Sequence, residues 1–388
     1  MSSDSAAKQR VLLMAGSMET GGSERQTLLL LRHLDRERFV PHLFLSRRCG
    51  DLLHQVPQDV IVHAFWDHHE TPWPNWPGRI HASQVRWLRQ VIRSNRIDVV
   101  YDRTFHMTLI AGPATRCMPG VRRIATIVSP PNRDVQGTEK RFLWIKKRRL
   151  AAAYAAADHV IAVSDVVADS TRAFYGLQPP SLPQLQVLPN PVDVETVTRS
   201  AADSSRQWFH ADDHSLKIIC VGRMTHEKGH DVLLRSVASL DRPAQLLLVG
   251  DGPRRQSIER SAMDLGIESK THFVGVVPNA CPAIAAADVL VLPSRYEGMP
   301  NAVLEAMVLG VPVIATTAGG TATLLRDGEC GIAVSPDDVN QMASAISNFE
   351  LTAPETIQRI EKARQMMLRQ YDIRHRLSAV QSLLSGDV

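Results

Sequence analysis

The chain has 388 residues with 44% hydrophobic and 22% charged residues, an ordinary composition that excludes a disordered chain. Its formal net charge of +4 is small and shows none of the concentrated excess expected of a dedicated nucleic-acid-binding protein. The length predicts about two domains, since single cores rarely grow beyond ~250–300 residues.

Short β-branched runs alternate with helical patterns along the whole chain, which predicts an α/β fold of parallel sheets covered by helices on both faces. In the first half, the expected strands are 10–16, 40–46, 60–65, 97–103, 123–128, 159–164 and 185–189. In the second half, they are 217–222, 245–250, 272–275, 289–294, 312–316 and 331–334. Each half therefore predicts its own doubly wound, Rossmann-like unit.

A glycine pair, Gly21-Gly22, follows the first expected strand and lets the backbone approach a ligand closely. We expect Ser23 to cap the helix that follows. An ordinary tight turn would use the same residues, so this signal is weak.

The segment 66–77 holds three tryptophans and three prolines and predicts an irregular loop. Tryptophan faces suit sugar rings, so contact with an acceptor is one interpretation. The other is a loop that packs its own tryptophans against the fold.

The segment Lys140–Leu150 mixes six cations with aromatic and aliphatic residues. A helix of this kind fits an anionic membrane surface. A solvated helix face is the competing interpretation.

The best linker candidate follows the motif LPNPVD, where two prolines and a loss of apolar periodicity precede the strand at Lys217. We expect an N-terminal domain over 1–194 and a C-terminal domain over 195–370. Ligands of such sheets bind at the carboxyl ends of the strands, so facing sheet ends would leave a cleft between the domains.

The stretch VGRMTHEKG ends a strand and carries two cations, Arg223 and Lys228. Arg223 offers a planar fork and Lys228 a point charge, and together they could neutralise one diphosphate. The alternative is a solvated pair, or an ion pair of Arg223 with Glu227.

The stretch 289–320 predicts a strand, a loop, a helix beginning at Asn301, a second strand and a glycine pair. Glu297 lies before this helix and Glu305 about one turn inside it. Free N–H groups and the helix dipole favour a diphosphate here, with Glu305 on a ribose and Glu297 on a sugar. The alternative is an amphipathic core helix with solvent-facing glutamates.

The chain resembles the family-4 retaining glycosyltransferases with the GT-B fold. The matching motifs are GGSERQ, VIAVSD, VLPNPVD, VGRMTHEKG, LLLVGDGP, HFVGVVPN, EGMPNAVLEAM and PVIATTAGG, in the expected order. The resemblance implies two Rossmann-like domains facing across a cleft, a nucleoside-diphosphate sugar as donor, and retention of anomeric configuration. It also implies that the helical segment 357–384 ends, over 371–388, against the N-terminal domain.

The same resemblance assigns roles to individual residues. Arg223 and Lys228 would hold the donor diphosphate, Glu305 the ribose, and Glu297 the transferred sugar. Val277 would meet the base and Gly22 the diphosphate. The backbone lining the donor sugar and phosphates would come from Gly298, Met299, Pro300 and Asn301.

One residue departs from the family pattern. Many relatives carry a histidine that contacts the donor sugar where this chain has Ser129. His106, expected in the loop after the strand 97–103, is the nearest candidate to replace it.

No Asp-x-Asp pair occurs in the chain, so we expect transfer without an obligatory metal or cofactor. Uridine diphosphate sugars are the favoured donors and guanosine diphosphate sugars the next. The acceptor would be a carbohydrate or a lipid-linked hydroxyl, as in relatives that build cell-surface polysaccharides. A sugar-nucleotide 2-epimerase and a non-catalytic nucleotide-sugar binding protein are the alternatives. A nicotinamide dehydrogenase is disfavoured, since no G-x-G-x-x-G opens a helix.

Five cysteines stand singly, without metal-ligand or redox spacing, so we expect reduced and mostly buried thiols. No apolar run approaches the ~20 residues that span a bilayer, and the first ten residues lack a signal peptide. These features predict a cytoplasmic protein, with the inner face of the membrane as its expected site of peripheral contact.

Overall fold

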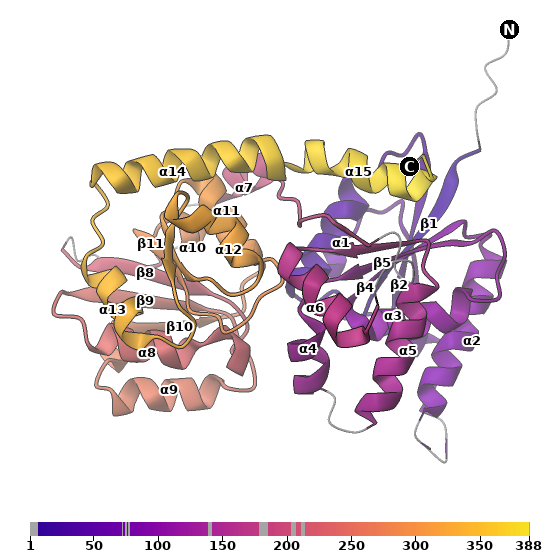
Figure 1. Cartoon of the computed structure of the whole chain (residues 1–388), viewed down its shortest axis with the longest axis horizontal. Helices are drawn as coiled ribbons and strands as arrows, with labels where there is room; N and C mark the ends of the chain where they lie inside the picture. Colours follow the sequence, from indigo (N-terminus) through magenta and orange to yellow (C-terminus); the bar gives the residue numbers. More distant parts are fainter. Residues whose placement is uncertain are drawn as a thin grey trace, which may run out of the picture. The chain divides into compact units, whose positions relative to one another are not determined.

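The computed structural model describes residues 7–71, 73, 76, 78–138, 142–177, 185–202, 207–210 and 214–387. The chain forms two compact units. The N-terminal unit comprises Met1–Pro189 and Arg376–Val388, and the C-terminal unit comprises Asn190–His375. Each unit contains one parallel sheet with helices on both faces, so the predicted α/β class with two Rossmann-like sheets is confirmed (Figure 1).

The N-terminal sheet has seven strands in the order β3-β2-β1-β4-β5-β6-β7, all parallel. All seven strands predicted for the first half are present. Their bounds are β1 Gln9–Ala15, β2 Phe39–Leu45, β3 Ile61–Ala64, β4 Val99–Arg103, β5 Arg122–Ile127, β6 His159–Ala162 and β7 Leu185–Val187.

Buried strands of this sheet send alternate side chains into two cores. From β1, Val11 and Leu13 enter a core with α1 and α15, whereas Leu12 and Met14 enter a core with α2 and α3. The helices are α1 Gly22–His33, α2 Arg79–Ser94, α3 Thr104–Thr115, α4 Pro131–Thr138, α5 Leu143–Ala155, α6 Asp165–Tyr175 and α15 Ile373–Ser385.

The start of α1 differs from the prediction. The helix begins at Gly22 with Gly21, which has no side chain, at its N-cap position. Ser23 is therefore the second residue of the helix, where its carbonyl accepts a hydrogen bond from the Thr27 hydroxyl. Ser23 is not the cap because the helix starts one residue before it.

The C-terminal sheet has six parallel strands in the order β10-β9-β8-β11-β12-β13. All six strands predicted for the second half are present. Their bounds are β8 Leu216–Val221, β9 Ala244–Val249, β10 Thr271–Gly275, β11 Val289–Leu292, β12 Val313–Thr316 and β13 Ile332–Val334.

Helices α8, α9 and α13 lie on one face of this sheet, and α7, α10, α11 and α14 lie on the other (Figure 1). The bounds are α7 Val194–Ala201, α8 His230–Ala238, α9 Arg255–Asp264, α10 Cys281–Ala285, α11 Asn301–Leu309, α12 Gly320–Leu325, α13 Val339–Ser347 and α14 Pro354–Met366. Part of the stretch expected as a linker is therefore helical, because Asp193 caps α7 by accepting from the Thr196 N–H.

The last helical segment is interrupted rather than continuous. After α14 comes a π-helical turn, Met367–Tyr371, and Asp372 then leaves the helical region with ψ of 134° before α15 begins. Its neighbours pair with Val192, whose N–H donates to the Tyr371 carbonyl and whose carbonyl accepts from Ile373. The interruption thus exchanges helical hydrogen bonds for a link to the segment after β7.

Beyond this interruption, the chain joins the N-terminal unit. Val380, Leu383 and Leu384 of α15 are buried in the same core as Val11 and Leu13. The Arg122 guanidinium donates to the carbonyl of Leu384 at the end of the helix. The C-terminal residues are therefore part of the N-terminal unit's core.

All five cysteines are free, and Cys220, Cys281 and Cys330 are buried while Cys49 and Cys117 are exposed. Within the described ranges, no helix is both long and apolar enough to cross a membrane.

Candidate active site

The turn after β8 carries Arg223 and Lys228. Arg223 is exposed and has no carboxylate partner within the described chain, so the alternative pairing with Glu227 is not present. The Lys228 side chain runs back over Gly222, with its Cδ 3.6 Å from where a Cβ of Gly222 would lie. Gly229 ends the turn with φ of +64° and is the N-cap residue of α8. The Lys228 stem thus packs along the backbone at Gly222.

The loop after β11 places Glu297 against Lys228. Lys228 Nζ donates to Glu297 Oε1 over 2.5 Å, and the buried Ser294 Oγ donates to the same oxygen over 2.7 Å. The Glu297 side chain is only 8% exposed. The alternative of a solvent-facing glutamate is therefore wrong for Glu297. Strands β8 and β11 are neighbours, so their carboxyl ends bring these two loops together.

Helix α11 begins directly after this loop, at Asn301 as predicted. Pro300 occupies the N-cap position and no side chain caps the helix. The Asn190 amide donates to the Met299 carbonyl over 3.4 Å and to Asn301 Oδ1 over 3.3 Å, which fixes the entrance. Glu305 lies half-buried one turn inside. The first N–H groups of α11 suit an anionic ligand.

After β12, Gly319 and Gly320 contact the backbone of the loop that carries Glu297. Gly319 has φ of +58°, and a Cβ there would lie 1.8 Å from the Glu297 carbonyl oxygen. Gly320 N–H donates to the Gly298 carbonyl over 3.1 Å. The sequence showed this glycine pair, but it did not show that its function is contact with the Glu297 loop.

Two buried titratable groups lie behind the site. Burial lowers the pKa of His230 to about 4, helped by the Lys228 charge, so this ring is neutral at pH 7. Burial raises the pKa of the Cys220 thiol to about 12, which makes it a poor nucleophile. These groups contribute to packing rather than to proton transfer.

Val277, the predicted base contact, is half-buried in the loop after β10, the edge strand of the same sheet. Gly22 and His106 belong to the N-terminal unit, where they follow the neighbouring strands β1 and β4. The Ser129 hydroxyl, at the position where relatives carry histidine, donates to Asp134 over 2.5 Å.

His106 does not lie in a loop as expected. Strand β4 ends at Arg103 and α3 begins at Thr104, so His106 is an exposed residue of the first helical turn. Thr104 has φ of +70°, unusual for a β-branched residue, and this conformation turns the chain from strand to helix without a loop. The His106 ring contacts the Phe105 ring, with centroids 3.9 Å apart.

Aromatic residues are exposed on two segments of the N-terminal unit. Trp73 and Trp76 are 90% and 68% exposed, whereas Trp66 is half-buried in a 3₁₀ turn and packs on Phe65. Phe142 and Trp144 are also exposed, as are Arg148 and Arg149 of α5. Lys140 and Arg141 lie outside the described residues. Exposed aromatic side chains at the start of α5 thus lie in the same segment as the exposed arginines Arg148 and Arg149.

Two family models match the chain. Residues 20–196 match the model described as Glycosyltransferase Family 4, and residues 215–349 match the model described as Glycosyl transferases group 1. The chain belongs to glycosyltransferase family 4. The resemblance inferred from the sequence motifs is therefore confirmed, and both units are parts of one family architecture.

Curated relatives of this family cover parts of the chain. A lipopolysaccharide core biosynthesis glycosyltransferase of Rhizobium meliloti is 35% identical over 34% of this chain and 38% of its own length. A GDP-mannose-dependent phosphatidylinositol monomannoside mannosyltransferase of Mycolicibacterium smegmatis is 28% identical over 68% of this chain and 69% of its own. The chain thus spans well under half of the first relative.

The fold also matches that of a solved structure. Alr3699/HepE of Anabaena, in complex with UDP and glucose, matches with a TM-score of 0.80 at 19% identity. The match covers 97% of this chain and all of that one. The GT-B fold expected from the resemblance is therefore confirmed.

Proposed function

We propose that the protein is a retaining glycosyltransferase that moves a sugar from a nucleoside-diphosphate sugar to an acceptor hydroxyl. The observation that carries this proposal is the contact between Lys228 and Glu297 at the entrance of α11. It joins a cation suited to a diphosphate with a carboxylate suited to a sugar. A nucleoside-diphosphate sugar needs a cation for its diphosphate and a carboxylate for its sugar within one small site.

The diphosphate is proposed to bind between the Lys228 ammonium, the Arg223 guanidinium and the first N–H groups of α11. Arg223 is exposed and Lys228 is partly exposed, so both can meet a ligand. Negative charge grows on the leaving diphosphate during transfer, and fixed cations and N–H dipoles stabilise it. Backbone groups of Gly298, Met299 and Pro300 would line the donor.

Glu297 is proposed to contact the transferred sugar. Both of its described hydrogen bonds reach Oε1, so within the described chain Oε2 is left for a sugar hydroxyl or a partly cationic ring. Retention would follow from attack on the same face, with the leaving phosphate oxygen taking the proton of the acceptor hydroxyl. Glu297 then stabilises the oxocarbenium-like state rather than acting as a nucleophile.

The remaining donor contacts are proposed from the family resemblance. Glu305 would accept hydrogen bonds from the ribose, and the backbone at Val277 would meet the base. From the N-terminal unit, Gly22 would contact the diphosphate and His106 would contact the sugar in place of a histidine at Ser129.

A UDP-sugar is the favoured donor and a GDP-sugar the next. The Anabaena structure is a complex with UDP and glucose, whereas the mycobacterial relative is named as GDP-mannose-dependent. The acceptor is proposed to be a carbohydrate or lipid-linked hydroxyl in cell-surface polysaccharide or glycolipid synthesis. The relative named for lipopolysaccharide core biosynthesis supports this class.

Transfer is proposed to need no metal, because Arg223, Lys228 and the start of α11 supply the positive potential. Activity should survive an excess of chelator, and its loss in a purified sample would reject this part.

The enzyme is proposed to act in the cytoplasm at the inner face of the membrane, held there by the segment Lys140–Leu150. Exposed Phe142 and Trp144 beside Arg148 and Arg149 support an anionic lipid surface. The protein should co-sediment with vesicles that contain anionic lipid and should not co-sediment with vesicles of neutral lipid.

A thermal-shift screen over nucleoside diphosphates and their sugars tests the donor class, since ligands of the folded state raise its stability. With a donor identified, Glu297→Gln should lower turnover by about tenfold or more, as lost transition-state electrostatics does. Unchanged turnover would remove Glu297 from the site. Conversion of the donor without acceptor would instead indicate an epimerase, and binding without transfer or hydrolysis a non-catalytic protein.

A further inference from the structure

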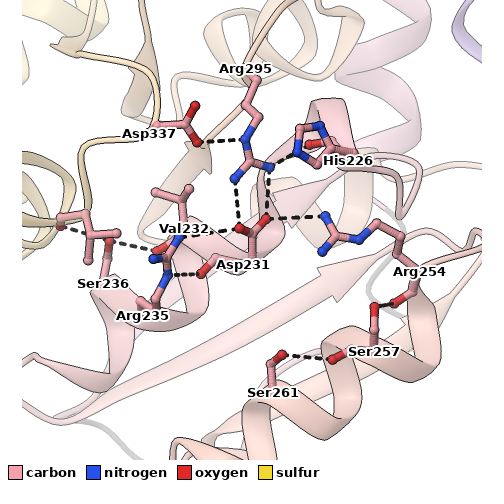
Figure 2. A network of polar contacts seen from close by, with 11 residues as sticks. His226, Asp231, Val232, Arg235, Ser236, Arg254, Ser257, Ser261, Arg295 and Asp337 are labelled. Atoms are coloured by element: carbon pink, nitrogen blue, oxygen red, sulfur yellow. Dashed lines mark hydrogen bonds and ion pairs between the residues drawn. The ribbon is translucent and has the colours of Figure 1, made fainter. Parts of the chain in front are cut away.

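Arg295 lies two residues before Glu297, and its side chain contacts residues of other loops. Figure 2 shows its guanidinium between Asp231 and Asp337, with the His226 carbonyl at its side. The side chain is only 14% exposed. It therefore contacts protein rather than solvent.

Four of the five N–H donors of this guanidinium are used within the protein. Nη1 and Nη2 donate to the two oxygens of Asp231 over 3.0 and 2.8 Å, which is a bidentate pair. Nε donates to Asp337 Oδ1 over 2.7 Å, and Nη1 also donates to the His226 carbonyl over 2.7 Å. Because its donors are used, Arg295 is a poor candidate for a phosphate ligand.

The partners of Arg295 come from two different connections of the sheet, the one from β8 into α8 and the one from β13 to α13. Asp231 lies in the first turn of α8, His226 in the turn that carries Lys228, and Asp337 in the loop between β13 and α13. Asp337 takes φ of +62°, a left-handed conformation that Asp tolerates better than most residues. One planar group thus links the Glu297 loop to the elements on both sides of it.

Backbone contacts join the same two loops at further points. The Arg295 N–H donates to the Glu227 carbonyl over 2.7 Å. A Cβ on Gly229 would lie 2.1 Å from the Pro293 carbonyl oxygen, so these backbones are in direct contact. The turn of Lys228 and the loop of Glu297 are therefore in direct backbone contact. The Arg295 side chain adds a further link between them through the His226 carbonyl.

Asp231 is the centre of this network (Figure 2). Besides Arg295, it lies 3.4 Å from Arg235 Nη2 and 3.6 Å from Arg254 Nη1. Burial raises the pKa of its carboxyl, but hydrogen bonding and charge from Arg295, with the charge of Arg254, more than offset this and hold the pKa below its usual value. Asp231 is therefore a carboxylate at neutral pH, where it pairs with the Arg295 guanidinium.

We propose that Arg295 is a positioning residue for the donor site, whose fork to Asp231, Asp337 and the His226 carbonyl sets the place of Lys228 relative to Glu297. This rests on the proposed function, since it assumes that Lys228 binds the donor diphosphate. Arg295 touches no reacting atom itself. Its effect on ligand binding passes through Lys228.

Isothermal titration with UDP tests this, because UDP carries the diphosphate but no sugar and so reports on Lys228 rather than Glu297. Arg295→Met should raise the Kd for UDP by about tenfold or more, since small misplacements of a binding group have effects of this size. Arg295→Lys should also weaken binding, because one ammonium cannot reach all three partners. Unaltered binding by Arg295→Lys would show that charge alone matters and would overturn the inference.

A double-mutant cycle separates positioning from general damage. In a Lys228→Met background, the further change Arg295→Met should alter the Kd by less than about twofold, since the group it positions is gone. A full additional loss in that background would overturn the inference.

Arg36→Met is the matched control in the N-terminal unit. Arg36 likewise contacts an aspartate, Asp59, through Nε and Nη2, and it donates to the carbonyls of Leu34 and Leu31. Its loss should cost comparable stability and leave UDP binding unchanged. An equal weakening by both variants would overturn the role of Arg295.

The proposed function fails in a different way. If the wild-type protein binds neither UDP nor GDP, or if Lys228→Met binds UDP as well as the wild type, the assignment of the donor site is wrong. If Lys228→Met loses binding while Arg295→Met keeps it, the site assignment stands and only the inference on Arg295 is overturned.

Discussion

Replacing His230 by leucine should make the C-terminal unit less sensitive to acid. His230 is 1% exposed, and neither ring nitrogen has a hydrogen-bond partner within the described chain. Burial and the nearby Lys228 lower its pKa from 6.5 to about 4. The folded protein therefore keeps the ring neutral at pH values where the unfolded chain already binds a proton.

The size of the effect follows from linkage. Full stability is present above pH 6.5, and it is lost as the pH falls from 6.5 to about 4, because only the unfolded state takes up the proton in that range. Between pH 8 and pH 5 this single group lowers the free energy of unfolding by about 2 kcal/mol. For a unit of this size that corresponds to a shift of roughly 4–8 °C in Tm.

Differential scanning calorimetry of the full chain at both pH values provides the test. His230→Leu changes the packing equally at pH 8 and pH 5, so the comparison uses the pH-dependent difference in Tm for each protein. Between pH 8 and pH 5, the Tm of the C-terminal unit should fall further in the wild type than in the variant, by roughly 4–8 °C. Equal drops would show that His230 is protonated in the folded state, or is not buried, and would refute the reasoning.

Two further predictions concern backbone and core. Gly319→Ala should weaken both stability and activity, because a Cβ at φ of +58° would overlap the carbonyl of Glu297; intact turnover with an unchanged Tm would contradict this. Truncation after Arg369 removes the buried Leu383 and Leu384, each worth about 2 kcal/mol, so the N-terminal unit should unfold or lose activity; a fully active truncated protein would reject it.

The sheets were predictable because parallel, buried strands leave a strong local signal. All thirteen strands lie where short β-branched runs stand between helical patterns. The residues at which helices start were harder to predict from the sequence. Ser23 carries a capping side chain but lies inside the helix, and His106 lies in a helix because Thr104 adopts a left-handed conformation. Composition and hydrophobic periodicity do not show at which residue either helix begins.

The sequence motifs predicted which residues belong to the candidate site, but not most of the contacts that these residues and their neighbours make with one another. The family resemblance assigned Lys228 and Glu297 to one donor, and the structure shows that they follow neighbouring strands and contact each other. The contacts of Arg295 with Asp231 and Asp337 could not be predicted, because these residues are 64 and 42 positions away and belong to no local pattern. Contacts between separate loops depend on the fold rather than on spacing.

The return of α15 to the first sheet has a consequence for synthesis on the ribosome. The C-terminal unit is one uninterrupted stretch, Asn190–His375, whereas the N-terminal unit needs Val380, Leu383 and Leu384 to complete its core. Domains generally fold as units as the chain emerges. The core of the half that is made first is therefore complete only once Val380, Leu383 and Leu384 have been made, after the whole C-terminal unit.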